Sequence, residues 1–136
     1  MHYVMDCSFS SALFLPDERS DIVREFFINL DKGDRVIVPL LWWYETDNVL
    51  NISVSRNRIS HSDVITILDL LDGIAPETDA GHGRECSGKI FELTQLYKIS
   101  AYDAVYLELA MRKKAALMTL DKDLEKAARK MGIAGK

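Results

Sequence analysis

Four acidic side chains, spread over the whole chain, stand where carboxylates could do chemistry. Asp6 and Asp121 each closely follow a short apolar run that predicts a β-strand. Glu45 interrupts the apolar stripe of a predicted helix, and Asp103 lies in the first turn of another. In open α/β sheets ligands bind beyond the carboxyl ends of the strands, so acids that follow strands lie where a ligand would be held.

Convergence of these four acids would require a cation. Ionised carboxylates about 5 Å apart repel by roughly 3 kcal/mol per pair at an effective dielectric constant near 20. Several such pairs would rival the typical stability of a domain, about 5 to 15 kcal/mol. Oxygen ligands without histidine or cysteine favour magnesium or manganese over zinc, so we expect Mg²⁺ or Mn²⁺.

Each of these acids also has a purely structural alternative. Aspartate is a common helix cap, which would account for Asp6, Asp103 or Asp121 taken singly. Glu45 lies on one helix stripe with Leu41, Val49 and Ile52, so its alternative is a buried ion pair, because a carboxylate that faces the core needs a partner. Only their convergence would favour a functional role.

Residues 100–110 predict a helix that is buried on nearly every side. Ser100 followed by Asp103 resembles a capping box, and the residues after them are mostly apolar. The positive end of the helix dipole favours the charged form of Asp103. Capping and cation binding are therefore compatible roles for this side chain.

Strand and helix patterns alternate along the chain, which predicts an α/β fold with a mostly parallel sheet. We expect a strand at 3–5, a helix capped by Ser8 and closed by Pro16, a helix at 22–30, a strand at 36–38 and a helix at 41–55. Further along we expect a helix from Ser60 that ends at Asp72-Gly73, a short extended piece and loop at 74–83, helices at 84–97, 100–110 and 122–131, a strand at 115–118 and a strand stub at 132–134.

Size and composition fit one globular domain, residues 1–136. The formal net charge is −4 and the sequence pI about 5.3, so any nucleic acid would have to be held locally. Cys7 and Cys86 lack metal-ligand or disulfide spacing, so we expect free thiols. Asp6 comes too early for a signal peptide, and the apolar run 36–44 is too short to span a bilayer, so we expect a cytoplasmic protein with no membrane contact.

Four motifs in the chain carry a family resemblance. They are Val4-Met5-Asp6-Cys7-Ser8; Pro39 followed by Glu45-Thr46-Asp47-Asn48-Val49-Leu50; Tyr102-Asp103-Ala104-Val105-Tyr106 with Ala110; and Leu117-Met118-Thr119-Leu120-Asp121-Lys122-Asp123-Leu124. In order and spacing they resemble the motifs of the PIN-domain nucleases, most closely the VapC-like toxin ribonucleases of prokaryotic toxin–antitoxin pairs. Leu124 stands where the family usually has a phenylalanine-like residue, and Asp123 could substitute for or assist Asp121.

The resemblance implies a PIN-like three-layer α/β/α sandwich and metal-dependent cleavage of RNA. Asp6, Glu45, Asp103 and Asp121 would bind one or two Mg²⁺ or Mn²⁺ ions as the catalytic residues. Ser8 and Thr119 would orient carboxylates through hydrogen bonds, with ordinary cap or turn hydroxyls as the alternative.

The resemblance also implies partners. RNA is the substrate, and the basic residues nearest the site elements in sequence are Arg56, Arg58, Arg112, Lys113, Lys114 and Lys122, for each of which a solvated surface is the alternative. A toxin implies an antitoxin whose segment lies in a hydrophobic groove and whose Arg or Lys enters the acid cluster. The family implies a homodimer.

Two other functions compete with this one. A PIN-like module that binds RNA or protein without useful catalysis would need no intact acid set. An aspartyl phosphatase or phospho-receiver would use Asp6 as phosphoryl acceptor, but the phosphatase pattern wants a second acid where this chain has Ser8, and a receiver wants an acid pair before Asp6.

Overall fold

Four short strands form one sheet in the computed structural model, which describes residues 1–15, 20–81 and 83–136. The strands are β1 (His2–Met5), β2 (Arg35–Pro39), β3 (Glu77–Asp79) and β4 (Ala116–Met118), in the order β3-β2-β1-β4. All three strand pairings are parallel, with Val4 of β1 between Ile37 and Leu117. The prediction of a mostly parallel sheet is confirmed.

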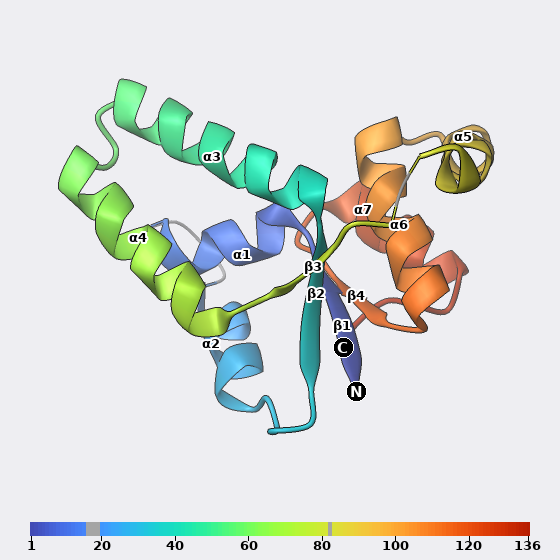
Figure 1. Cartoon of the computed structure of the whole chain (residues 1–136), viewed down its shortest axis with the longest axis horizontal. Helices are drawn as coiled ribbons and strands as arrows, with labels where there is room; N and C mark the ends of the chain where they lie inside the picture. Colours follow the sequence, from blue (N-terminus) through green and yellow to red (C-terminus); the bar gives the residue numbers. More distant parts are fainter. Residues whose placement is uncertain (16–19, 82) are drawn as a thin grey trace.

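Helices cover both faces of the sheet. Figure 1 shows one group on one side, α1 (Cys7–Phe14), α2 (Ser20–Ile28), α3 (Leu40–Ser55) and α4 (His61–Ile74). On the other side lie α5 (Arg84–Tyr97), α6 (Ala101–Lys113) and α7 (Lys122–Lys130). The three-layer α/β/α arrangement is therefore confirmed, and every predicted helix is present within two or three residues of its expected bounds.

The central strands are apolar because helices cover them from both sides. Val4 and Met5 of β1 and Val38 of β2 are fully buried, which is the usual state of parallel strands in an α/β protein. Trp42 of α3, in the group of helices α1 to α4, is also fully buried, and its indole N–H donates to the hydroxyl of Ser10. The polar atom of this large core side chain is thus satisfied.

The helix beginning at Ala101 is the most buried element on the other face. Its residues from Tyr106 to Ala110 are all buried, whereas its first turn and its last residues reach solvent and Val105 is partly buried. Ser100 caps it by accepting from the amide of Asp103, as the sequence predicts. The helix packs against α5 and against three strands of the sheet, so it fixes the position of Asp103.

Two helix boundaries differ from prediction. Asp6, and not Ser8, is the N-cap of α1, because Asp6 has extended backbone angles and its carboxylate accepts from the amide of Phe9. The predicted stop at Asp72-Gly73 is also wrong: α4 continues through Gly73 to Ile74, and Ala75 ends it in a left-handed conformation. The capping box of Ser60 and Asp63 at the other end of α4 is confirmed.

Several smaller predictions can be placed on the structure. The extended piece within 74–83 is β3, and the strand stub is a single bridge between Leu117 and Ala134. Cys7 and Cys86 are free thiols, as expected. Pro16 and His82 lie outside the described residues. Among the described helices, none has both the length and the apolar character needed to cross a bilayer.

Candidate active site

The parallel register of the two central strands brings two of the predicted motifs together. Met5 is paired with Met118, so the residues that follow, Asp6 and Thr119, leave the sheet side by side at its carboxyl edge. The amide of Asp6 donates to the carbonyl of Met118, which continues the ladder past the last paired residues. This edge is where an α/β sheet holds its ligand.

Two hydroxyl groups hold the carboxylate of Asp6. Ser8 donates to both of its oxygens at 2.8 and 2.9 Å, and Thr119 donates to Oδ2 at 2.6 Å. Each hydroxyl has one proton, and both protons are directed at Asp6. The same hydroxyl oxygens accept the amides of Leu120 and Asp121, so they join the first motif to the fourth.

Asp6 is a carboxylate whose ionisation the fold makes costly. Its side chain is buried, and this burial raises its pKa to about 6 although Thr119, the amide of Phe9 and Ser8 all favour the charged form. The charge of Asp121 raises the pKa further. A nearby cation would favour the ionised form and reverse this penalty.

Glu45 reaches the same edge from α3 and has an uncharged partner. The phenol of Tyr106 donates to its Oε1 at 2.5 Å. Burial raises the pKa of Glu45, the bond from Tyr106 lowers it, and the charge of Asp103 raises it. The buried ion pair considered as the alternative is absent among the described residues, because the partner that satisfies Glu45 is a phenol.

Tyr106 belongs to the third motif, but the sequence pattern alone predicts no role for it at the site. It lies three residues after Asp103, so both side chains lie on the same side of α6. This spacing is the sequence signal that could have placed Tyr106 at the site. It does not name Glu45, which is 61 positions away in the chain, as the partner.

The remaining acids complete a chain of neighbouring charges. Burial raises the pKa of Asp103, and the charges of Asp121 and Asp123 raise it further, while a bond with Ser100 lowers it. Asp121 is exposed and caps α7 by accepting from the amide of Leu124 at 2.8 Å. Capping, the structural alternative for Asp6 and Asp121, is thus present together with their proximity to the other acids.

The four acids fit a hard divalent cation in chemistry, although they do not surround a single point. All four donate oxygen only, and each influences another: Asp121 raises the pKa of Asp6 and Asp103, and Asp103 that of Glu45. Within residues 1–15, 20–81 and 83–136, no three acidic, histidine or cysteine side chains are grouped closely enough to hold an ion. The match is one of donor type and charge.

The predicted RNA contacts divide between exposed and engaged side chains. Arg56, which follows α3, and Lys122, the first residue of α7, are exposed. Arg112 donates to both oxygens of Asp79 and of Glu108, and Lys113 also pairs with Asp79. These bonds raise the pKa of Arg112 and lower that of Asp79, so Arg112 serves to tie α6 to the edge of the sheet.

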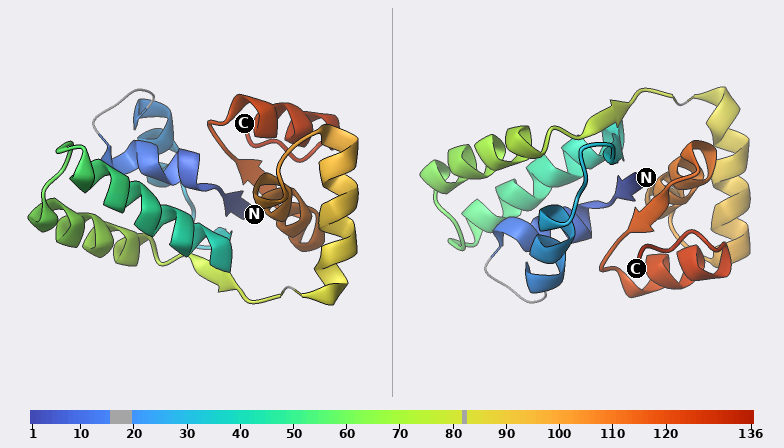
Figure 2. Two further views of the ribbon diagram at one scale, coloured as in Figure 1. Left: turned by 90° about the horizontal axis from the view of Figure 1, so that it is seen from above. Right: turned by 90° about the horizontal axis from the view of Figure 1, so that it is seen from below.

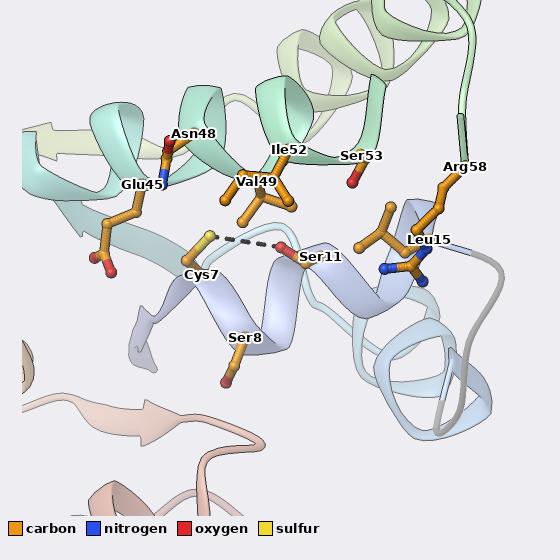
Figure 3. A pocket seen from close by; sticks show the side chains of 10 residues that line it. All are labelled: Cys7, Ser8, Ser11, Leu15, Glu45, Asn48, Val49, Ile52, Ser53 and Arg58. Atoms are coloured by element: carbon orange, nitrogen blue, oxygen red, sulfur yellow. Dashed lines mark hydrogen bonds between the residues drawn. The ribbon is translucent and has the colours of Figure 1, made fainter. Parts of the chain in front are cut away.

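A pocket of about 470 Å³ lies between α1 and α3 and extends from the acidic edge. Figure 3 shows Glu45 at one end and Arg58 at the other, with Val49 and Ile52 of α3 between them and Ser8 on α1 pointing away from α3. The wall contains further polar groups, among them the hydroxyl of Ser11, whose oxygen lies 3.5 Å from the thiol of Cys7. The pocket can therefore hold a mixed apolar and polar group beside the acids.

Comparisons with known proteins place the chain in a family. No curated protein sequence matches it closely enough to count as a relative. Two crystal structures share the fold with a TM-score of 0.70 and 17% identity: PAE2754 from Pyrobaculum aerophilum, covering 93% of this chain and 79% of that one, and VapC20 from Mycobacterium tuberculosis, covering 92% and 94%. The family model of the PIN domain matches residues 3–130. The chain therefore belongs to the PIN domain family.

Proposed function

We propose that this protein is a Mg²⁺- or Mn²⁺-dependent ribonuclease that hydrolyses RNA phosphodiester bonds at the carboxyl edge of its sheet. One observation carries the proposal: a PIN domain gathers acids at this edge and raises the pKa of three of them, Asp6, Glu45 and Asp103. A bound cation would offset these penalties, and perturbed carboxylates in a cluster are typical of functional sites.

In this proposal each side chain has a defined role. Asp6, Glu45, Asp103 and Asp121 would hold the ion, directly or through water. When bound, a divalent cation supplies hydroxide at neutral pH and offsets the charge that grows on the phosphoryl oxygens. Three hydroxyl groups, those of Ser8, Thr119 and Tyr106, would orient the carboxylates to which they donate.

A substitution at Asp103 tests the catalytic proposal. We expect Asp103→Asn to keep the fold, because Asn can occupy the first turn of α6 and the Ser100 cap uses the backbone amide. Mg²⁺-dependent RNA cleavage should fall by more than the roughly 10- to 100-fold that hydrogen-bond partners of ligands contribute. Asp69→Asn, an exposed acid on α4, is the matched control. Full activity in Asp103→Asn would overturn the assignment.

The two competing functions are outcomes of similar experiments. A binding module without catalysis would leave thermal stability unchanged when Mg²⁺ is titrated, whereas a cation site must stabilise the folded state. A phosphoryl acceptor at Asp6 would be trapped as an acyl phosphate. Both oxygens of Asp6 accept hydrogen bonds from Ser8, Thr119 or Phe9. A carboxylate oriented in this way is better suited to bind a metal ion than to attack a phosphoryl group.

We also propose a toxin role in the cytoplasm, with a cognate antitoxin and a homodimeric state. The support is the likeness to VapC20, which is described as a Sarcin-Ricin loop cleaving toxin. Expression of the protein should arrest growth, and co-expression of a small neighbouring reading frame should relieve the arrest. Light scattering of the purified protein measures the dimer. Growth that continues despite expression of active protein would contradict the toxin role.

The pocket between α1 and α3 is the proposed seat of the antitoxin segment. Its apolar wall would hold an apolar segment, and its Glu45 end would receive a basic side chain of the antitoxin. Ile52→Lys, at a position lining the pocket, should abolish co-purification of the antitoxin. Ile65→Lys on α4, which is exposed and does not line the pocket, is the control and should have no effect.

A further inference from the structure

A second groove lies on the opposite face of the sheet, between the end of α5 and α7. It has a volume of about 340 Å³, and three lysines line it: Lys98, which caps α5, and Lys126 and Lys130 on α7. The partly exposed side chain of Tyr97 forms part of its wall, and the buried Ala127 lies at its base. Figure 2 shows the end of α5 beside α7 in both views. We name this the α5–α7 groove.

The α5–α7 groove concentrates positive charge on an acidic protein. The chain carries a formal net charge of −4, yet three lysines and one acid, Asp123, line this groove. All three lysines are exposed, and within the described ranges none lies within ion-pair distance of a carboxylate. Arg129, by contrast, is paired with Glu125 on the same helix. The three lysine charges are therefore available to an anion.

The groove begins beside the acidic site. Asp121 caps α7, and Asp123, one residue into the helix from Lys122, lines the groove and is close enough to Asp103 to raise the pKa of that residue. At 1.5 Å per residue, Lys126 and Lys130 lie about 4.5 and 10.5 Å beyond Asp123 along the axis of α7. The two lysines are thus about 6 Å apart along the axis, a separation similar to that of neighbouring phosphates in an extended strand.

We propose that the α5–α7 groove binds the phosphate backbone of single-stranded RNA on one side of the bond to be cut. Lys126 and Lys130 contact successive phosphates from α7, and Lys98 closes the groove from the end of α5. The identity of the anion as RNA rests on the proposed ribonuclease function. The groove explains how a protein of negative net charge holds a polyanion near its own acids.

The lining of the groove favours RNA over an acidic peptide. Tyr97 offers an aromatic ring next to the lysines, and aromatic rings beside a positive groove are typical of single-strand binding because bases stack on them. The groove also continues from the edge where the scissile phosphate would lie.

The salt dependence of RNA binding tests the proposal. A fluorescent, unstructured RNA is titrated with the full-length Asp103→Asn protein at several salt concentrations, so that cleavage does not interfere. The double variant Lys126→Ala, Lys130→Ala is added to this background, and Ala keeps the helix because it has the highest helix propensity. Loss of two phosphate contacts should lower the slope of log K against log salt by about 1.4, which corresponds to about 25-fold weaker binding at 0.1 M salt.

The matched control removes the same charge from the other edge of the sheet. Lys32 precedes β2 and Lys136 is the last residue, and Figure 1 shows both segments at the edge where β1 begins. Lys32→Ala, Lys136→Ala should leave the slope nearly unchanged. An equal loss of slope in both double variants, or none in either, overturns the groove.

Two further outcomes separate this proposal from the proposed function. If the wild-type protein cleaves no RNA but the double variant still shows the smaller salt slope, the groove proposal stands and the ribonuclease proposal is overturned. If the wild-type protein cleaves RNA but the double variant binds RNA as tightly as the control, the ribonuclease proposal stands and the groove proposal is overturned. Polyglutamate that competes as well as RNA of equal charge identifies an acidic protein as the ligand and overturns the RNA assignment.

Discussion

Replacement of Asp6 by Asn should reveal the strain that one buried carboxylate places on the metal-free protein. Asp6 is only 5% exposed, and its pKa is raised from 3.8 to about 6 by burial. Hydrogen bonds from Thr119, Phe9 and Ser8 reduce this shift without removing it. Asn is as good an N-cap as Asp and is uncharged at every pH, so Asp6→Asn mimics the protonated form.

The size and sign of the effect follow from the shift. About two pKa units correspond to about 3 kcal/mol, since one unit is worth 1.36 kcal/mol. The pKa is higher in the folded than in the unfolded state, so the folded state binds the proton more tightly. The stability that the protonated Asp6 gives the folded state is therefore fully present below pH 4. It is lost as the pH rises from about 4 to about 6, and it stays lost at higher pH.

We expect the difference in the free energy of unfolding between Asp6→Asn and wild type to rise by up to 3 kcal/mol between pH 4 and pH 8. The bond from Thr119 must be rearranged in the variant, which removes about 1 kcal/mol. A net gain of about 2 kcal/mol at pH 8 corresponds to roughly 6 to 10 °C in Tm for a domain of this size.

Urea unfolding in the presence of a chelator, followed by circular dichroism from pH 4 to pH 8, measures the difference. Use of the difference cancels the titration of other acids, such as Glu45 and Asp103, whose pKa values are also raised. Asp69→Asn serves as the control and should give a flat difference. The reasoning is refuted if the Asp6→Asn difference is equally flat, or if the variant is less stable than wild type at pH 8.

Two further predictions concern the partners of buried carboxylates. Tyr106→Phe removes the hydrogen bond to Glu45 and should lower Mg²⁺-dependent activity about 10- to 100-fold with the fold retained, and a Mg²⁺ titration of activity checks this. Arg112→Met leaves the buried carboxylate of Glu108 without its ion-pair partner and Asp79 with Lys113 alone, and should lower the free energy of unfolding by about 3 kcal/mol. Arg129→Met, at an exposed ion pair, should change it by less than about 1 kcal/mol in the same denaturation assay.

Sequence patterns were sufficient where the cause of structure is local. Short apolar runs followed by an acid predicted β1 and β4, and the Ser60 and Asp63 spacing predicted the start of α4. The stop predicted from Asp72-Gly73 was wrong, because an apolar contact one residue further on, at the half-buried Ile74, outweighs the low helix propensity of glycine. Local signals thus fixed the identity of elements better than their ends.

The contacts between distant segments could not be predicted in this way. The strand order β3-β2-β1-β4 depends on which helices pack together, and no local pattern encodes it. Arg112 illustrates the consequence: its position near the site elements in sequence suggested RNA contact, but β3 lies at the sheet edge and presents Asp79 to it. Likewise, nothing in the sequence joins Lys98 of α5 to Lys126 of α7.

The strongest part of the predicted site rests on a simple property of parallel strands. Residues that follow paired positions leave the sheet together, so a motif of acid, any residue, Ser after β1 must meet a motif of Thr, any residue, acid after β4. Here that meeting places the hydroxyls of Ser8 and Thr119 on Asp6, and the amide of Asp121 on Thr119. The two spacings of two residues therefore specify one hydrogen-bonded unit. Loss of either hydroxyl should raise the pKa of Asp6, because the hydrogen bond from each hydroxyl lowers it.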